Sequence, residues 1–454
     1  MKLDLRFIVP GPLPATVLRD DDGRLPAALV EIDENGAAIV PASAFLRDAW
    51  AFATPVLETH PREDGVPAGE PIPTLVATDV AAADWPPPAG LAFGPLPAAS
   101  ADLPEAIAPR ARELLGELRD GAPLPALRPR WARPGWHDRA SRWMRTAAAE
   151  VGRPLTGDPM PFYLRGISAL LRATTAGPDL FLKAVFPPFH AEPVLTRLLA
   201  ARFPDRMPSV VAVEPDEGWL LVEDLAAPWV VELPGAGKAA GLAAGARTLV
   251  EMQTAITPAD VEALVAAGSP RRPLAELADA FATTTGPEAP AFAGEPLAPE
   301  RRDRALAATR AAAARVMALG YPETVVHGDF HAGNAALVDG RIVIIDWSDA
   351  AIGNPAVDLV TWLAWSKDEP DEQVVATAAW IDAWSGVVDP AAAHAALDDI
   401  LIVGAAYQVI SYDGIVRGLE PATQYTMAGG ATSYLRTLEA RLEPRGPAAG
   451  TSPT

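Results

Sequence analysis

The stretch His327-Gly328-Asp329-Phe330-His331-Ala332-Gly333-Asn334 decides the fold class, together with Asp346-Trp347-Ser348-Asp349, which begins seventeen residues after Asp329. Each cluster follows a short β-like run, 324–326 before the first and 342–345 before the second. Transfer of a phosphoryl group to a hydroxyl needs a carboxylate that relieves the hydroxyl of its proton, and a carboxylate and a carboxamide that hold Mg²⁺. A lone aspartate is more simply a turn residue or a helix cap. The ordered combination of both clusters nevertheless predicts a phosphoryl-transfer site.

A lysine upstream of these motifs supports this interpretation. Lys183 lies within the apolar run 180–186, and strand and turn patterns from 162 to 225 predict a five-stranded sheet with one helix. A lysine on a largely buried strand needs an anionic partner, and Glu192 in the following helix is the candidate. An edge-strand lysine that extends its ammonium group into water is the simpler alternative. No Gly-x-Gly-x-x-Gly precedes Lys183, so Arg165-Gly166-Ile167-Ser168 is the candidate for a turn that covers phosphates.

The pattern of predicted strands and helices divides the chain into three regions, 1–135, 136–228 and 229–454. The first predicts an antiparallel sheet with loops and a helix near 103–118, and it shows no cluster of titratable residues. After Pro234, Ala-rich segments predict helices near 236–256, 273–284, 298–318, 371–385, 391–414 and 423–442. Four tryptophans in this last region are expected to pack a core: Trp362, Trp365, Trp380 and Trp384.

Composition limits the class of protein. The chain has 454 residues, of which 50% are hydrophobic and 21% charged, which fits a soluble globular protein with two or three cores. The net charge of -21 repels phosphate backbones and anionic lipids, so neither nucleic acid nor a membrane is expected as a partner. The absence of cysteine excludes disulfides, thiolate metal sites and a cysteine nucleophile. No signal peptide and no apolar run of about 18 residues is apparent, which predicts a cytoplasmic protein of unspecified oligomeric state.

The motifs resemble those of the aminoglycoside phosphotransferase and choline kinase group of the protein-kinase-like superfamily. The pattern His327-Gly-Asp329-x-His-x-x-Asn334 and the pair Ile345-Asp346 carry this resemblance, which extends over about residues 150 to 440. It implies an α+β, bilobal protein-kinase-like fold with a five-stranded N-lobe, a helical C-lobe and an N-terminal α+β cap. It also implies that Asp329 is the catalytic base, that Asn334 and Asp346 bind Mg²⁺, and that His327 supports the loop. The His-Arg-Asp and Ala-Pro-Glu segments of protein kinases are absent, which favours a small-molecule acceptor.

The same resemblance implies the nucleotide side of the site. Lys183 and Glu192 would hold the α- and β-phosphates of ATP. The hinge between the lobes would pass through 223–225, so that the backbone at Glu223 and Leu225 would bind adenine, although acidic residues that close a strand usually form a solvated turn. Asp358 would brace the catalytic loop, with a buried helix cap as the plain alternative.

Residues for the acceptor are predicted from one of the C-terminal helices. Gln408 and Tyr412 are four residues apart and share a helix face, and a carboxamide with a phenol suits a neutral hydroxylated ring. A satisfied core contact explains this pair equally well. Asp349 and the negative net charge would favour an ammonium group on the acceptor. Farther along the helix, charged residues at spacings of four and three predict a solvated ladder of ion pairs: Asp413, Arg417 and Glu420.

Together these observations predict an ATP- and Mg²⁺-dependent kinase that converts D-glucosamine to glucosamine 6-phosphate, in carbohydrate metabolism. The chain resembles actinobacterial maltokinases and glucosamine kinases in its length, its cap and its Ala-, Pro- and Arg-rich composition. Maltokinases carry Gln at the position of Asn334, so the resemblance to glucosamine kinases is the nearer one. An aminoglycoside antibiotic O-phosphotransferase is the alternative, because several amines would exploit the negative charge further. A non-catalytic nucleotide- or ligand-binding protein on the same fold is the alternative from another class, although a site without chemistry need not keep its catalytic residues.

Overall fold

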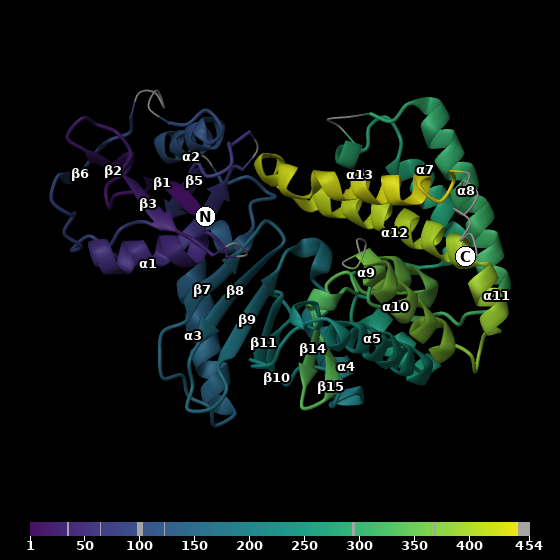
Figure 1. Ribbon diagram of the computed structural model, residues 1–454. Helices are drawn as coiled ribbons and strands as arrows, with labels where there is room; N and C mark the ends of the chain where they lie inside the picture. Colours follow the sequence, from purple (N-terminus) through teal and green to yellow (C-terminus); the bar gives the residue numbers. More distant parts are fainter. Residues whose placement is uncertain are drawn as a thin grey trace, which may run out of the picture. The chain divides into compact units, whose positions relative to one another are not determined.

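The structure is a computed structural model that describes residues 1–33, 36–63, 65–97, 103–121, 123–292, 296–364, 366 and 369–443 (Figure 1). The chain forms two compact units, each assembled from separate segments. The first consists of Met1–Phe186, Trp219–Asp224 and Leu419–Thr423, and the second of Pro187–Gly218, Leu225–Gly418 and the chain from Gln424 onward. The division at residues 135 and 228 that the sequence suggests stays a prediction.

A mixed sheet and a helix form the N-terminal part of the first unit. The sheet has the order β3-β1-β5-β4, from β1 (Lys2–Ile8), β3 (Ala27–Glu31), β4 (Val56–Pro61) and β5 (Ile72–Thr78). Strands β1 and β5 are parallel, so the prediction of a purely antiparallel sheet is wrong. The helix α1 (Ile39–Trp50), also not predicted, buries Ile39, Ala42 and Leu46 at helical spacing. It lies in the long connection that a parallel pair requires. Three further elements complete this part: β2 (Thr16–Asp20), β6 (Leu91–Pro95) and α2 (Ala108–Asp120).

A second, antiparallel sheet follows the helix α3 (Trp136–Glu150). Its order is β10-β11-β9-β8-β7, which confirms the five strands expected from the sequence. The strands are β7 (Met160–Leu164), β8 (Ser168–Ala173), β9 (Leu180–Val185), β10 (Val210–Glu214) and β11 (Trp219–Glu223). Lys183 on β9 faces Leu170 on β8 and Leu220 on β11 in register. Because β9 has a neighbour on each side, the edge-strand alternative for Lys183 does not hold.

The second unit is mainly helical. Its described helices are α4 (Glu192–Arg202), α5 (Ala236–Ala255), α6 (Pro258–Ala266), α7 (Leu277–Thr284), α8 (Pro299–Ala318), α9 (Asp358–Ala364), α10 (Pro370–Ala383), α11 (Pro390–Ala395), α12 (Leu397–Gly418) and α13 (Tyr425–Glu439). The single helix predicted at 391–414 is wrong, because Ala396 leaves helical geometry and separates α11 from α12. Among the described residues, α12 is long and apolar enough to cross a membrane, but 78% of its apolar window is buried within the protein.

Short strands place both polar clusters of the sequence. β13 (Thr324–Val326) pairs with β16 (Ala351–Gly353), which also pairs with β12 (Arg271–Arg272). β14 (Ala335–Val338) and β15 (Arg341–Ile344) form a hairpin. The first cluster therefore connects β13 to β14, and the second connects β15 to β16. Both clusters are loops whose two ends are each held by a strand.

The aromatic core of the second unit anchors the first of these loops. Phe330 stacks on Trp362, with ring centroids 4.0 Å apart and an interplanar angle of 9°. Trp362 in turn fills the space beside Gly245 on α5, where a Cβ atom would lie 2.6 Å from Cζ2 of the indole. Trp380 and Trp384 are also buried, as predicted, whereas Trp365 lies outside the described residues.

This close approach predicts an opposite effect of the same substitution at two glycines of α5. Gly245→Ala should lower the free energy of unfolding by about 1–3 kcal/mol, because the added methyl group overpacks against Trp362. Gly237→Ala should leave stability unchanged or raise it by up to about 1 kcal/mol, because the position is exposed and alanine favours the helix. Denaturant unfolding measures both, and equal effects would contradict the packing described above.

Candidate active site

A buried aspartate fixes the backbone of the first polar loop. Asp358, at the start of α9, is 1% exposed and accepts hydrogen bonds from the backbone N–H groups of His327 (3.1 Å) and Gly328 (2.9 Å). Gln253 on α5 donates to the same carboxylate at 2.8 Å and to the Val325 carbonyl at 3.1 Å. Burial raises the pKa of Asp358 to about 6, although these donors oppose the shift. Both oxygens of the Asp358 carboxylate therefore accept hydrogen bonds that hold the loop.

Gly328 is required where the two polar clusters meet. Its φ of +82° lies in the left-handed region, and a Cβ atom there would lie 2.9 Å from the backbone carbonyl carbon of Asp349. A side chain would therefore separate the first cluster from the second.

His327 joins the two clusters through both ring nitrogens. Its Nδ1 accepts from the backbone N–H of Asp329 at 3.3 Å, so its Nε2 carries the proton and donates to the Ile345 carbonyl at 2.9 Å. The ring also packs against Trp347, with centroids 4.7 Å apart. The supporting role that the resemblance implies for His327 stays a prediction.

The candidate base lies at the exposed edge of this framework. The side chain of Asp329 is 44% exposed, and its backbone carbonyl accepts from the Asn334 carboxamide at 3.0 Å. His331 Nε2 lies 3.7 Å from the Asp329 carboxylate. Burial lowers the pKa of His331 to about 4, so the ring is neutral at neutral pH. His331 stands in the quoted motif, but its place beside Asp329 was not predicted.

The candidate metal ligands are adjacent through the backbone. The Ile345 N–H donates to the Asn334 carbonyl at 3.0 Å, which brings Asp346 next to Asn334. Asp346 has a φ of 63°, a conformation that aspartate tolerates better than most residues, and it accepts from the Ser348 hydroxyl at 2.6 Å. Carboxylate and carboxamide oxygens fit Mg²⁺. Among the described residues no group of three or more His, Cys, Asp or Glu could hold a metal ion.

Asp349 has internal partners. Its carboxylate accepts from Arg272 at 3.3 Å and from the Ser411 hydroxyl. Arg272 also donates to the Tyr407 hydroxyl at 2.9 Å. Burial raises the pKa of Asp349, although the Arg272 guanidinium opposes the shift. An ammonium group of a substrate would have to compete with this guanidinium for the carboxylate.

Gln408 and Tyr412 lie on α12 but contact different groups. The buried carboxamide of Gln408 donates to the Gly328 carbonyl, so it contributes to the backbone framework of the loop. Tyr412 packs against Tyr434 on α13, with centroids 5.8 Å apart, and α12 and α13 lie side by side (Figure 1). Gly430 permits this packing, because a Cβ atom there would lie 2.6 Å from Cζ of Tyr412.

The two tyrosines lie within the electrostatic influence of the candidate base. Burial raises the pKa of Tyr412 to about 12, and the negative charges of Asp329 and Asp349 add to this shift. Burial, Tyr412 and the same two carboxylates raise the pKa of Tyr434. Both phenols therefore stay protonated at neutral pH and can act as hydrogen-bond donors.

Comparison with known proteins identifies the family of a chain with this site. A family model described as the phosphotransferase enzyme family matches residues 166–393, half of the chain. The chain belongs to this phosphotransferase family. The prediction of a small-molecule kinase that acts on a hydroxyl is confirmed at the level of the family. No curated protein matches the chain.

Solved structures of kinases with a similar fold include a choline/ethanolamine kinase family protein from Mesorhizobium loti. It shares 17% identity over 68% of this chain and 95% of that chain, with a TM-score of 0.48. Choline kinase LicA from Streptococcus pneumoniae shares 12% identity over 66% and 98% of the two chains, with a TM-score of 0.46. A thermostable mutant of aminoglycoside phosphotransferase APH(4)-Ia, in a ternary complex with ADP and hygromycin B, shares 15% identity over 68% and 99%, with a TM-score of 0.42. The sheets of the first unit and the helices of the second confirm the α+β class expected from the sequence.

The residues predicted to bind the nucleotide are divided between the two units. Lys183 and Glu223 belong to the first unit, where Glu223 forms an ion pair with Arg153. Glu192 and Leu225 belong to the second, where Glu192 is buried in the first turn of α4. The pairing of Lys183 with Glu192 and the adenine-binding role of 223–225 stay predictions.

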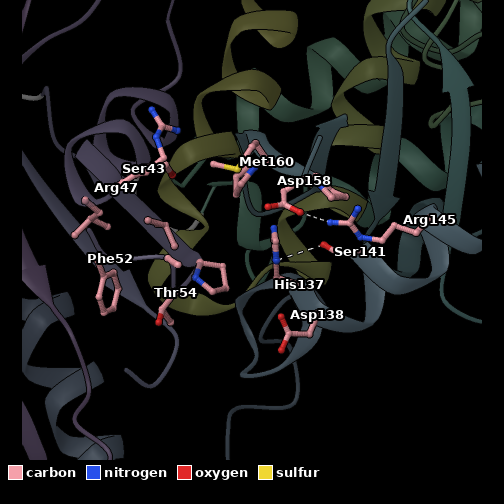
Figure 2. Close-up of a pocket in the computed structure, with 16 residues that line it drawn as sticks. Ser43, Arg47, Phe52, Thr54, His137, Asp138, Ser141, Arg145, Asp158 and Met160 are labelled. Atoms are coloured by element: carbon pink, nitrogen blue, oxygen red, sulfur yellow. Dashed lines mark hydrogen bonds and ion pairs between the residues drawn. The ribbon is translucent and has the colours of Figure 1, made fainter. Parts of the chain in front are cut away.

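A separate cavity in the first unit contains none of the predicted site residues. The cavity has a volume of about 320 Å³, and residues of α1 and of α3 contribute to its lining. Figure 2 shows the residues that line it. Two pairs of its polar residues bind each other: Arg145 forms an ion pair with Asp158, and the Ser141 hydroxyl lies 3.4 Å from His137 Nδ1. The Ser43 hydroxyl in the same lining is buried without a hydrogen-bond partner, and one unpaired hydroxyl does not identify a ligand.

The role of Asp358 as the anchor of the loop predicts a large loss of stability on its removal. Asp358→Ala should lower the free energy of unfolding by at least about 3 kcal/mol, because several buried donors lose their acceptor at about 1–3 kcal/mol each. Asp389→Ala is the matched control. Asp389 also accepts two backbone N–H groups, but as the exposed N-cap of α11, and its loss should cost about 1 kcal/mol. Similar losses in denaturant unfolding would show that Asp358 is no anchor.

Proposed function

We propose that this phosphotransferase uses ATP and Mg²⁺, and that Asp329 is its catalytic base. The observation that supports this most directly is the 44% exposure of the Asp329 side chain on a loop whose other functional side chains are largely buried. The backbone of Asp329 is held by the Asn334 carboxamide and by His327 Nδ1. A general base must be accessible to the substrate and fixed in position, and Asp329 meets both conditions.

The proposed reaction balances without a further reactant. The acceptor oxygen forms a bond to the γ-phosphorus, the bond from this phosphorus to the bridging oxygen breaks, and ADP leaves with the electron pair. The hydroxyl proton passes to the Asp329 carboxylate. Bound Mg²⁺, held by Asn334 and Asp346, would neutralise charge on the phosphates. Lys183 and Glu192 are proposed to act on the α- and β-phosphates, and the backbone at 223–225 on adenine.

We further propose an amino sugar as the acceptor, with D-glucosamine giving glucosamine 6-phosphate. Tyr412 and Tyr434 offer aromatic faces and phenol donors, and Tyr412 lies within the electrostatic influence of Asp329, which suits a hydroxylated ring. The negative charge of Asp329, which adds to the raised pKa of Tyr412, also favours an ammonium group on the acceptor. Gln408 and Asp349 would act through the Gly328 carbonyl and Arg272, which they already contact.

An aminoglycoside acceptor is the second candidate. The net charge of -21 attracts an acceptor with several ammonium groups more strongly than one with a single amine. The non-catalytic alternative loses its basis, because the chain belongs to an enzyme family. The cytoplasmic location and the absence of nucleic-acid and membrane partners stay predictions.

The role of Asp329 predicts a selective loss of turnover. Asp329→Asn should lower kcat by about 10²- to 10⁴-fold, because the amide cannot take the hydroxyl proton, and should leave nucleotide affinity within about twofold. Steady-state kinetics and calorimetry with an ATP analogue measure the two quantities. Asp339→Asn, in the exposed turn between β14 and β15, is the control and should behave as the unaltered protein. An unchanged kcat would remove Asp329 from the mechanism.

The acceptor hypothesis is tested with four compounds that separate its chemical requirements. Glucosamine should have a kcat/KM at least about tenfold above glucose, which lacks the amine, and above N-acetylglucosamine, which lacks its charge. Kanamycin, a larger compound with several amines, tests the alternative of an aminoglycoside acceptor. A value for glucosamine no higher than for the other three would refute the amino-sugar proposal, and a preference for kanamycin would establish the second candidate.

A further inference from the structure

A buried carboxylate holds a five-residue segment within the first unit. Glu420, in the segment Leu419–Thr423, is 1% exposed. It accepts from Arg128 at 2.7 and 2.9 Å and from Arg110 at 3.1 and 3.4 Å. The prediction that Glu420 belongs to a solvated ladder of ion pairs is therefore wrong. Asp413 forms the expected ion pair with Arg417 at 2.6 Å, but it is buried and also accepts from the backbone N–H of Ala291 at 3.3 Å.

Both arginines come from the N-terminal region and are themselves held there. Arg110 on α2 donates to both carboxylate oxygens of Glu58 on β4 at 2.7 Å. Arg128 donates to both oxygens of Glu117 on α2, at 2.7 and 3.2 Å. Residues 1–135 therefore contain a cluster of titratable residues that the sequence did not reveal. Replacing a buried ion pair by apolar groups is often neutral for stability. We therefore interpret this cluster as a device that fixes the position of the segment Leu419–Thr423 rather than as a source of stability.

The same segment packs on the turn proposed to cover phosphates. A Cβ atom on Gly166 would lie 2.7 Å from Cδ2 of Leu419 and 3.5 Å from Oγ1 of Thr423. The φ of Gly166 lies outside the left-handed region, so its missing side chain is explained by this close approach. On the neighbouring residue, the Arg165 carbonyl accepts from the Trp131 indole at 2.9 Å. Both contacts limit the movement of the turn.

The segment is also the covalent connection between two helices of the second unit. The chain enters it from α12, which carries Tyr412, and leaves it toward α13, which carries Tyr434. Within the segment, the Thr423 N–H and hydroxyl both bind the Glu420 carbonyl, at 2.8 and 3.0 Å. The connection is thus a closed turn, and fixing Glu420 limits how the ends of both helices move.

We propose that Glu420 is a positioning residue for phosphoryl transfer. Through Arg110 and Arg128, the N-terminal region fixes the segment Leu419–Thr423, which couples the tyrosines on α12 and α13 to the turn at Gly166. This inference rests on the proposed function, because the acceptor role of the two tyrosines is itself a proposal. It assigns the N-terminal region a part in acceptor binding and in nucleotide binding without giving it a residue that touches either substrate.

Glu420→Gln tests the anchor, because it keeps the shape of the side chain and removes its charge. We expect the KM for the acceptor to rise at least about fivefold while kcat at saturation stays within about twofold, since positioning affects binding before chemistry. Glu113→Gln is the matched control. Glu113 binds the same Nη1 of Arg110 at 2.8 Å but is 42% exposed, and its loss should change neither parameter. Equal acceptor KM values in the two variants, or a fall in kcat with KM unchanged, would overturn the proposal.

Gly166→Ala tests the contact with the turn without removing a charge. We expect calorimetry with an ATP analogue to show at least about threefold weaker nucleotide binding, because Leu419 must move. In the double variant Gly166→Ala with Leu419→Ala the opposing atom is gone, and at least half of the lost affinity should return. Unchanged affinity in the single variant, or no recovery in the double one, would refute the coupling. This measurement needs no acceptor, so it remains decisive if no compound of the panel is phosphorylated, a result that would refute the proposed function instead.

Discussion

The hydrogen bonds that Asp358 accepts from the backbone of His327 and Gly328 are the constraint on which the site depends. The buried backbone N–H groups of a loop need hydrogen-bond acceptors, and a loop without regular secondary structure must find them in other parts of the protein. Asp358 provides the acceptor, and Gln253 keeps the carboxylate oriented. Burial makes the charged form costly, as the raised pKa of Asp358 shows. The hydrogen bonds from His327, Gly328 and Gln253 offset part of the free-energy cost of burying the charged carboxylate.

Packing extends this constraint into the core of the second unit. Phe330, next to the candidate base, stacks on Trp362, and Trp362 occupies the space that Gly245 leaves on α5. His327 adds a contact from the other cluster through Trp347 and the Ile345 carbonyl. Asp329 is therefore held by main-chain hydrogen bonds on one side and by close-packed aromatic rings on the other. Its side chain remains exposed because everything that fixes it acts through its backbone and its neighbours.

The sequence predicted what local patterns can encode. Short contiguous signals were predicted correctly. The two motif clusters follow the strands β13 and β15, and Lys183 lies on the strand β9. Partners far apart in the chain were not predictable, because one sequence carries no information on which distant residues meet. Gln253 and Asp358 are 105 residues apart, Arg272 and Asp349 are 77 apart, and Arg110 and Glu420 are 310 apart. The helix α1 was missed because its apolar residues follow turn signals that resemble those between strands.

The interactions of Gln408 and Asp349 change the account of how this phosphotransferase selects its acceptor. Both were expected to face the acceptor, yet their polar groups bind the Gly328 carbonyl and the Arg272 guanidinium. A buried group that already has a partner adds little affinity for a ligand, because the ligand must first replace that partner. In the proposed function, selection among acceptors would therefore depend on the rings and hydroxyls of Tyr412 and Tyr434. These two rings are on separate helices, so their spacing depends on whatever fixes the connection between α12 and α13.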